Sequence, residues 1–248
     1  MSKRVALVTG GMGGIGTAVC RRLAGMNGNV VAANCLPGYD RKEVWLARLR
    51  AEGLDNVFAA EGDVADFESA AAMVRAIESQ IGPVDILVNS AGIVRDNILR
   101  KMSPSDWLAV INTNLNSAFN VTKHVIDGMC ERGWGRVVNL SSVNGQKGQF
   151  GQTNYSAAKA GVHGFAKALA QEVVKRGVTV NSVSPGYVET DMVRSIRADV
   201  LERIVAGIPM GRLAKPDEIA GLIAYLASDE AGYITGANIA INGGMYMS

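Results

Sequence analysis

The chain has 248 residues, of which 48% are hydrophobic and 19% charged, a balance that suits a folded domain and excludes a disordered chain. The formal net charge is +2 and the Lys and Arg residues are scattered, so we expect no nucleic-acid partner. No apolar run approaches the ~20 residues of a membrane span, and the first run is too short for a signal peptide. We therefore expect a cytoplasmic protein with no membrane contact. The three cysteines and two histidines are spaced too widely for a disulfide framework or a metal site.

Seven short apolar runs, separated by helical patterns, indicate alternating strands and helices. The runs cover residues 5–8, 30–33, 57–60, 84–88, 137–140, 178–181 and 239–241. They are continuous rather than alternating, which is typical of strands covered on both faces. Helical spacing is found over residues 15–26, 41–52, 67–81, 106–132, 154–176 and 216–228. We predict an α/β fold in which residues 1–248 form a single doubly wound, Rossmann-type domain, with a mainly parallel sheet of about seven strands and helices on both faces.

Such a sheet binds its ligands in a crevice at the carboxyl ends of the strands. Residues 190–208 follow the sixth strand and form the longest segment without a strand of its own. We predict that this segment forms a lid over the crevice.

A glycine-rich turn joins the first strand to the first helix. It reads Thr9-Gly10-Gly11-Met12-Gly13-Gly14-Ile15-Gly16, and this strand-to-helix context is where a backbone closely approaches a pyrophosphate. We therefore predict dinucleotide binding. The expected contacts from this turn are Gly10, Met12, Gly14, Ile15 and Gly16.

Residues after the second and third strands indicate which dinucleotide is bound. Enzymes that use NAD usually place an acid at the end of the second strand, to bond the ribose 2′-hydroxyl, but this chain has Asn34 there. A 2′-phosphate is not repelled by Asn34, and Arg41 and Lys42 are candidate partners of that phosphate, with Arg41 as the main one. We therefore predict NADP(H). Asp63 and Val64 are expected beside the adenine, although Asp63 is equally suited to a turn.

A tyrosine and a lysine share one face of a predicted helix. Tyr155 and Lys159 are four residues apart, so the ammonium group is near enough to favour the phenolate. Ser142 follows the strand at 137–140, on the crevice side of the sheet, where its hydroxyl can hold a carbonyl oxygen. The three side chains together predict proton exchange with a carbonyl or an alcohol, with Tyr155 as the donor.

Over its whole length the sequence resembles the short-chain dehydrogenase/reductase family. The motifs in family order are Thr9-Gly10-x-x-x-Gly14-Ile15-Gly16, Asn89-Ser90-Ala91-Gly92, Asn114, Ser142, Tyr155-x-x-x-Lys159 and Pro185-Gly186. The resemblance implies that Ser142 orients the carbonyl, that Tyr155 is the general acid or base, and that Lys159 binds the nicotinamide ribose. It implies a water relay at Asn114 and a carboxamide contact at Thr190. Further cofactor contacts are implied at Asn89, Ala91, Gly92, Pro185 and Gly186, and Ser90 replaces the family's usual Asn.

Within the family, the run from Ser142 to Tyr155 resembles reductases that convert acetoacetyl-CoA to (R)-3-hydroxybutyryl-CoA for polyhydroxybutyrate synthesis. This resemblance implies an acyl-CoA substrate and a pocket lined by Gln149, Phe150, Gln152 and Tyr187. It also implies a homotetramer. One alternative is a 3-oxoacyl-(acyl-carrier-protein) reductase, which performs the same chemistry on a protein-bound thioester. A second alternative is a dinucleotide-sensing regulator without catalysis.

Overall fold

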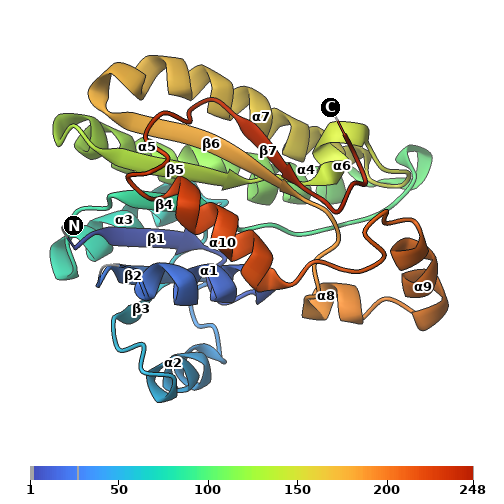
Figure 1. The fold of residues 1–248 in the computed structure, drawn as a ribbon, viewed down its shortest axis with the longest axis horizontal. Coiled ribbons are helices and arrows are strands. Elements are labelled where there is room, and N and C mark those ends of the chain that lie inside the picture. Colours follow the sequence, from blue (N-terminus) through green and yellow to red (C-terminus); the bar gives the residue numbers. More distant parts are fainter. Residues whose placement is uncertain (1–2, 27, 248) are drawn as a thin grey trace.

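Figure 1 shows a computed structural model of the chain, which describes residues 3–26 and 28–247. The end positions of the expected domain, 1, 2 and 248, lie outside the described residues. The seven strands are β1 (Val5–Thr9), β2 (Val30–Cys35), β3 (Val57–Glu61), β4 (Ile86–Asn89), β5 (Gly135–Leu140), β6 (Val178–Pro185) and β7 (Asn238–Ile241). They form one sheet in the order β3-β2-β1-β4-β5-β6-β7, and every neighbouring pair is parallel. The predicted fold class is confirmed.

The strand order reverses next to β1, and this reversal locates the crevice. The chain first builds β1, β2 and β3 outward in one direction, and then returns so that β4 pairs with the free side of β1. Val8 accordingly pairs with Ala33 on one side and with Val88 on the other. The crossovers leave β1 in opposite directions here, so a crevice opens at the carboxyl ends of β1 and β4.

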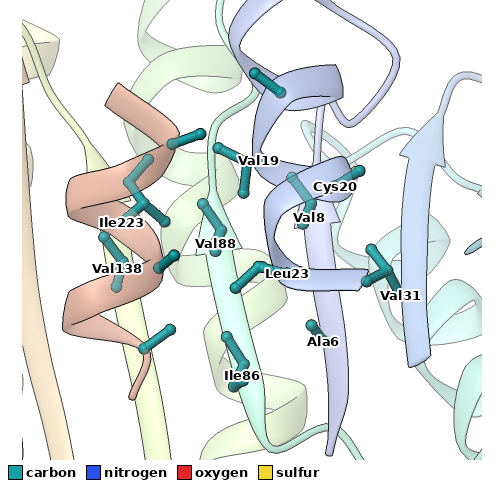
Figure 2. Close-up of a cluster of buried hydrophobic side chains, with 14 of the residues drawn as sticks. Ala6, Val8, Val19, Cys20, Leu23, Val31, Ile86, Val88, Val138 and Ile223 are labelled. Carbon is teal, nitrogen blue, oxygen red and sulfur yellow. The ribbon is translucent and has the colours of Figure 1, made fainter. Parts of the chain in front are cut away.

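Helices cover both faces of the sheet. One face carries α1 (Gly14–Ala24), α2 (Lys42–Ala51) and α10 (Pro216–Leu226), and the other carries α3 (Phe67–Gln80), α5 (Ser117–Glu131) and α7 (Thr153–Val173). Figure 2 shows the first core layer, where Leu23 of α1 and Ile223 of α10 meet Val88 and Val138 of the sheet. All four side chains are buried, and each contributes about 1.5–3 kcal/mol through the apolar surface it removes from water.

The single helix predicted over residues 106–132 is divided in the structure. It consists of α4 (Pro104–Ile111), a π turn (Asn112–Asn116) and α5. Ser103 begins α4 by accepting a hydrogen bond from the Asp106 amide, and Pro104 occupies the first turn, where it costs no hydrogen bond. A π turn contains one extra residue, and such turns are frequently found at functional sites.

The segment predicted as a lid contains two short helices, α8 (Asp191–Arg194) and α9 (Ala198–Ala206). Figure 1 shows both at the end of the molecule opposite the N-terminus. None of the α9 side chains is fully buried, so little apolar packing holds α9 in place. Closure of this segment over a ligand stays a prediction.

Across the described residues, no helix combines the length and apolar character that crossing a membrane requires.

Charged and aromatic side chains connect the elements at the amino ends of the strands. Arg136 of β5 is buried and donates from Nε to the Ser228 carbonyl oxygen at 3.1 Å, just after α10. The guanidinium groups of Arg4 and Arg136 lie over the Trp134 ring, 3.8 and 4.5 Å from its centroid. The Trp134 Nε1 donates to Asp229 at 2.9 Å. These noncovalent contacts connect the amino ends of the strands to the end of α10.

Candidate active site

The glycine-rich turn packs closely against the ends of β4 and β6. Gly10 has φ +61°, and a Cβ added there would lie 2.9 Å from the Ala91 Cα, so this position favours glycine. A Cβ on Gly14 would lie 2.7 Å from the Thr190 Cγ2. The predicted cofactor residues Gly10, Gly14, Ala91 and Thr190 are thus brought together from three separate loops.

The first turn of α1 is suited to an anion. Its first helical hydrogen bond runs from the Thr17 amide to the Gly13 carbonyl oxygen, so the amides of residues 14–16 precede the helical hydrogen-bonding pattern. The Gly13 cap offers no side chain, and α1 has no acid in its first turn. The amides and the helix dipole therefore fit a pyrophosphate. Met12 and Ile15 are partly buried beside these glycines.

Hydrogen bonds join the end of β1 to the end of β4. The Thr9 hydroxyl accepts from the Ser90 and Ala91 amides at 2.9 and 3.1 Å. Ser90 thus keeps a main-chain role that does not depend on its side chain. The Asn89 amide group is buried and donates to Asn139 at 2.8 Å, so Asn89 supports the crevice from inside the sheet. Gly92 is exposed at the same edge.

Asn34 holds the glycine-rich turn to the neighbouring strands. Its Oδ1 accepts from the Gly10 amide at 3.2 Å, and its Nδ2 donates to the Ala60 and Gly62 carbonyl oxygens at 3.3 and 2.9 Å. The amide that stands in the position of the usual acid is therefore fully used by the protein. Arg41 immediately precedes α2, and its exposed side chain has no ion-pair partner within the described residues.

Asp63 and Val64 lie in the turn after β3. The Asp63 Oδ1 accepts from the Ala65 amide at 2.9 Å, which is the local turn considered as the alternative role of Asp63. Val64 is buried, and its carbonyl oxygen accepts from the Asn120 side chain at 3.0 Å. This turn is thereby fixed to α5 at the crevice edge.

Ser142, Tyr155 and Lys159 meet where β5 ends. Ser142 caps α6 (Val143–Lys147), a short helix that the sequence analysis did not predict, and its Oγ accepts from the Asn144 amide at 3.1 Å. The Ser142 hydroxyl is also hydrogen-bonded to the Tyr155 phenol. Lys159 is only 3% exposed, and its Nζ lies 5.8 Å from the Tyr155 ring centroid and donates to the Leu140 carbonyl oxygen at 2.7 Å.

Burial dominates the proton affinities of this site. It raises the pKa of Tyr155 above its ordinary value; the hydrogen bond from Ser142 lowers this pKa, and the negative charge of Asp96 raises it. Burial also lowers the pKa of Lys159 from 10.5 to about 8. The expectation that the Lys159 ammonium favours the phenolate stays a prediction, because the surroundings that the chain itself provides act on the pKa of Tyr155 mainly through burial. The phenol is protonated at neutral pH, ready to donate.

Asn114 lies in the π turn and is buried. Its Oδ1 accepts from the Ile93 amide at 2.8 Å, and its Nδ2 donates to the Ile93 carbonyl oxygen at 2.9 Å. The side chain is committed to the main chain of Ile93, which supports the loop after β4. A water contact from Asn114 would therefore come from its own main chain.

Among the predicted substrate residues, Gln152 has the side chain with the most hydrogen bonds to the rest of the protein. Its Oε1 accepts from Asn144 and its Nε2 donates to Asp96, both at 2.9 Å. The Asp96 charge also raises the pKa of Tyr187, after burial. Asp96 therefore lies near Gln152, Tyr155 and Tyr187, although the sequence analysis did not select it. Its position a few residues beyond the end of a central strand was the available signal.

The other predicted substrate residues have fewer contacts. The Gln149 Oε1 accepts from Lys147 at 3.1 Å, and Phe150 is 87% exposed, with its ring in solvent. Tyr187 and Ile208 border a cavity of about 300 Å³ between the ends of β6 and β7 and the segment after α9. A larger hollow of about 580 Å³, between α1 and α10, contains none of the predicted site residues.

Pro185 is the last residue of β6, and Gly186 follows it beside the last strand. The Gly186 amide donates to the Ile241 carbonyl oxygen at 3.0 Å, and a Cβ on Gly186 would lie 3.0 Å from Asn242. From there the chain reaches Thr190 against the glycine-rich turn. The end of β6 thus carries both Tyr187 and Thr190 to the crevice.

A parallel doubly wound sheet, an anion-binding glycine turn, and a Ser-Tyr-Lys group at one crevice define a dinucleotide-dependent oxidoreductase. The family model for short chain dehydrogenases matches residues 4–201. The chain belongs to the short chain dehydrogenase family, whose cofactor is a nicotinamide dinucleotide.

Named relatives are similar over the full length of the chain. The chain is 60% identical over 247 residues to an acetoacetyl-CoA reductase of Cupriavidus necator, with 100% of both chains covered. It is 58% identical to nodulation protein G of Azospirillum brasilense, with 99% of both chains covered. It is 45% identical to a 3-oxoacyl-(acyl-carrier-protein) reductase of Pseudomonas aeruginosa, covering 99% of this chain and 98% of that protein.

Proposed function

We propose that this protein uses NADPH to reduce acetoacetyl-CoA to (R)-3-hydroxybutyryl-CoA, the monomer for polyhydroxybutyrate synthesis. The observation that carries the proposal is the Ser142-Tyr155-Lys159 group, with Gln152 held beside it by Asp96. The higher identity to an acetoacetyl-CoA reductase, 60% against 45% for the carrier-protein reductase, favours the coenzyme A thioester.

In the proposed reaction, the bound nicotinamide supplies a hydride to the carbonyl carbon. The Ser142 hydroxyl holds the carbonyl oxygen, and the Tyr155 phenol gives that oxygen its proton. The raised pKa of Tyr155 suits this direction because the phenol is protonated before the reaction. The nearby Lys159 cation then stabilises the phenolate that forms. Asn114 is proposed to support the return of a proton to Lys159 through water bound to its main chain.

The proposed substrate pocket combines fixed and free side chains. Gln152 is oriented by Asp96 and Asn144, so its amide is preorganised for the thioester end of the substrate. Gln149, Phe150 and Tyr187 are proposed to enclose the short acyl group, with the Phe150 ring free to turn onto it.

A basic residue at the rim is proposed to meet the phosphates of coenzyme A. Arg197 is paired with Asp199 at 2.9 Å, whereas the exposed Lys101 has no ion pair in the described parts of the chain. Lys101 is therefore the better candidate.

The proposed NADPH contacts follow the crevice from end to end. They are Gly10, Met12, Gly14, Ile15 and Gly16 on the pyrophosphate, Arg41 on the 2′-phosphate, Asp63 and Val64 at the adenine, and Asn89, Ala91, Gly92, Tyr155, Lys159, Pro185, Gly186 and Thr190 toward the nicotinamide. We further infer a homotetramer joined through α4 and α5, through α7 and through β7, to which the exposed Leu108 of α4 and Phe119 of α5 would contribute apolar surface.

The proposal is tested by following the absorbance of NADPH with acetoacetyl-CoA, with a β-ketoacyl carrier protein, and with NADH in place of NADPH. We expect acetoacetyl-CoA with NADPH to give the highest kcat/KM. Tyr155→Phe removes the positioned proton donor and is expected to lower the rate by about 10²–10⁴-fold. A preference for the carrier protein would contradict the substrate, and near-normal activity of Tyr155→Phe would contradict the mechanism. NADPH binding without consumption would favour the regulator.

A further inference from the structure

A carboxylate lies at the corner where β2 and β3 end, one strand away from the position where NAD enzymes usually have their acid. Glu61 is the last residue of β3 and is in register with Cys35, the last residue of β2. Both Glu61 oxygens are occupied. The Lys42 Nζ lies 2.6 Å from Oε1, and the Gly38 amide donates to Oε2 at 3.0 Å.

Both charges of this pair act on the end of β2. After burial, the Glu61 carboxylate is what most raises the pKa of the Cys35 thiol, and the Lys42 ammonium lowers it. Glu61 and Lys42 are partly exposed, with 37% and 28% of their side-chain surface open to solvent. Glu61 is thus solvent-accessible at the carboxyl ends of β2 and β3, the corner where a doubly wound fold is expected to receive the ribose of a dinucleotide.

A carboxylate at this corner without a partner would select against NADPH. It would repel the 2′-phosphate, and it would accept a hydrogen bond from the 2′-hydroxyl of NADH. Paired with Lys42, which also lies 3.6 Å from Glu43, the Glu61 charge is compensated by a cation. Each Glu61 oxygen already accepts one hydrogen bond, which makes it a weaker acceptor for a ribose. Asn34, which adjoins Cys35, cannot take over either role because its amide is used by Gly10, Ala60 and Gly62.

We propose that Lys42 determines cofactor choice indirectly, by neutralising Glu61, so that the corner admits a 2′-phosphate. The inference rests on the proposed use of NADPH and deepens it. Arg41 contacts the phosphate directly, whereas Lys42 acts through Glu61. The two adjacent basic residues therefore have different roles, which a double-mutant cycle separates.

The test measures equilibrium dissociation constants of NADP⁺ and NAD⁺ by calorimetry, without turnover. Lys42→Gln leaves Glu61 charged and without its ion-pair partner. We therefore expect NADP⁺ to bind about tenfold more weakly, which is the size of a like-charge repulsion across a partly solvated gap. The dissociation constant of NAD⁺ should change little. Adding Glu61→Gln to Lys42→Gln should return the NADP⁺ dissociation constant to within about threefold of the parent. Lys42→Arg keeps the pair and should keep the cofactor preference.

Two control variants set the scale. Arg21 forms a similar ion pair with Glu52 at 2.6 Å, with nearly the same exposure but away from the ribose corner, so Arg21→Gln should leave the ratio of the two dissociation constants unchanged. Arg41→Gln should weaken NADP⁺ binding whether or not Glu61 is replaced.

The outcomes separate this inference from the proposed function. If Lys42→Gln does not change the ratio, or if the double variant binds NADP⁺ as weakly as Lys42→Gln, the masking of Glu61 is wrong although NADPH use stands. A parent protein that binds NAD⁺ better than NADP⁺ overturns both.

Discussion

Lys159 combines a proposed catalytic role with a cost in stability. Its ammonium group is buried, and the only hydrogen bond it makes among the described residues is to the Leu140 carbonyl oxygen. Burial lowers its pKa from 10.5 to about 8, which corresponds to about 3 kcal/mol of destabilisation when the group is charged in both folded and unfolded protein. The proposed catalytic role would explain why a residue that costs the fold stability occupies this position.

Lys159→Met is therefore expected to raise the free energy of unfolding at pH 7 by about 1–3 kcal/mol, because the unpaired Leu140 carbonyl offsets part of the gain. The gain is full below pH 8, where Lys159 is charged in both states. It shrinks between pH 8 and 10.5, where the unfolded protein binds more protons than the folded protein. Urea unfolding at pH 7 and pH 9.5 measures this. A variant less stable than the parent at pH 7 would contradict the burial cost.

At the scale of elements, the contact between the start of α1 and the start of α8 joins two distant segments of chain. Gly14 and Thr190 touch there, with room for a hydrogen atom but not for a methyl group on Gly14. We therefore predict that cofactor binding and the position of the predicted lid are coupled through this contact.

Gly14→Ala is expected to push Thr190 outward and to weaken NADP⁺ binding about tenfold, because an inserted methyl group costs about 1–3 kcal/mol in a close-packed site. Thr190→Ser removes the Cγ2 atom that would clash but keeps the hydroxyl, so the double variant should recover most of the affinity. Gly16→Ala is the control, since its methyl group would meet the Gly10 carbonyl oxygen and Thr190→Ser cannot relieve that clash. An equal loss with and without Thr190→Ser would argue against the contact. Calorimetry gives the affinities.

The sequence predicts the long elements well and the short ones poorly. Continuous apolar strands and periodic helices carry a signal over many residues, so all seven strands were recognised. The π turn at Asn114 was missed because one inserted residue hardly alters the periodicity of a long helix, and α6 is too short to show any. Asp96 was missed because its importance arises from three-dimensional proximity to Gln152 and Tyr155. The raised pKa of Tyr155 likewise depends on burial, which spacing along a helix does not report.

At the scale of the whole molecule, the two edges of the sheet are built differently. The carboxyl edge carries the crevice, with short loops rich in glycine. The amino edge carries the Arg136 and Trp134 cross-links to the end of α10. We therefore predict that the Arg136 and Trp134 contacts contribute to stability and not to the proposed chemistry at the other end of the strands.

Arg136→Met should therefore lower the free energy of unfolding by about 2–4 kcal/mol, because it leaves the partly buried Ser228 carbonyl without its donor and removes a cation from the Trp134 ring. The kcat of the folded variant should be unchanged. Asp229→Asn should cost much less, since Asp229 is half exposed and lies 4.0 Å from Arg136. Urea unfolding and a kcat measurement check both expectations. A loss of kcat in folded Arg136→Met would contradict the separation of the two edges.

The hydrogen bonds of Asn34 limit how the coenzyme preference can be redesigned. An aspartate at the end of the second strand is the obvious change when NADH is wanted. At position 34 it would replace an amide donor by a carboxylate facing the Ala60 and Gly62 carbonyl oxygens, and would loosen the glycine-rich turn that is proposed to bind the pyrophosphate. We therefore expect this substitution to weaken the binding of any dinucleotide rather than to change the preference from NADPH to NADH. Glu61, already at the corner and paired with a partly exposed lysine, is the position from which such a redesign should begin.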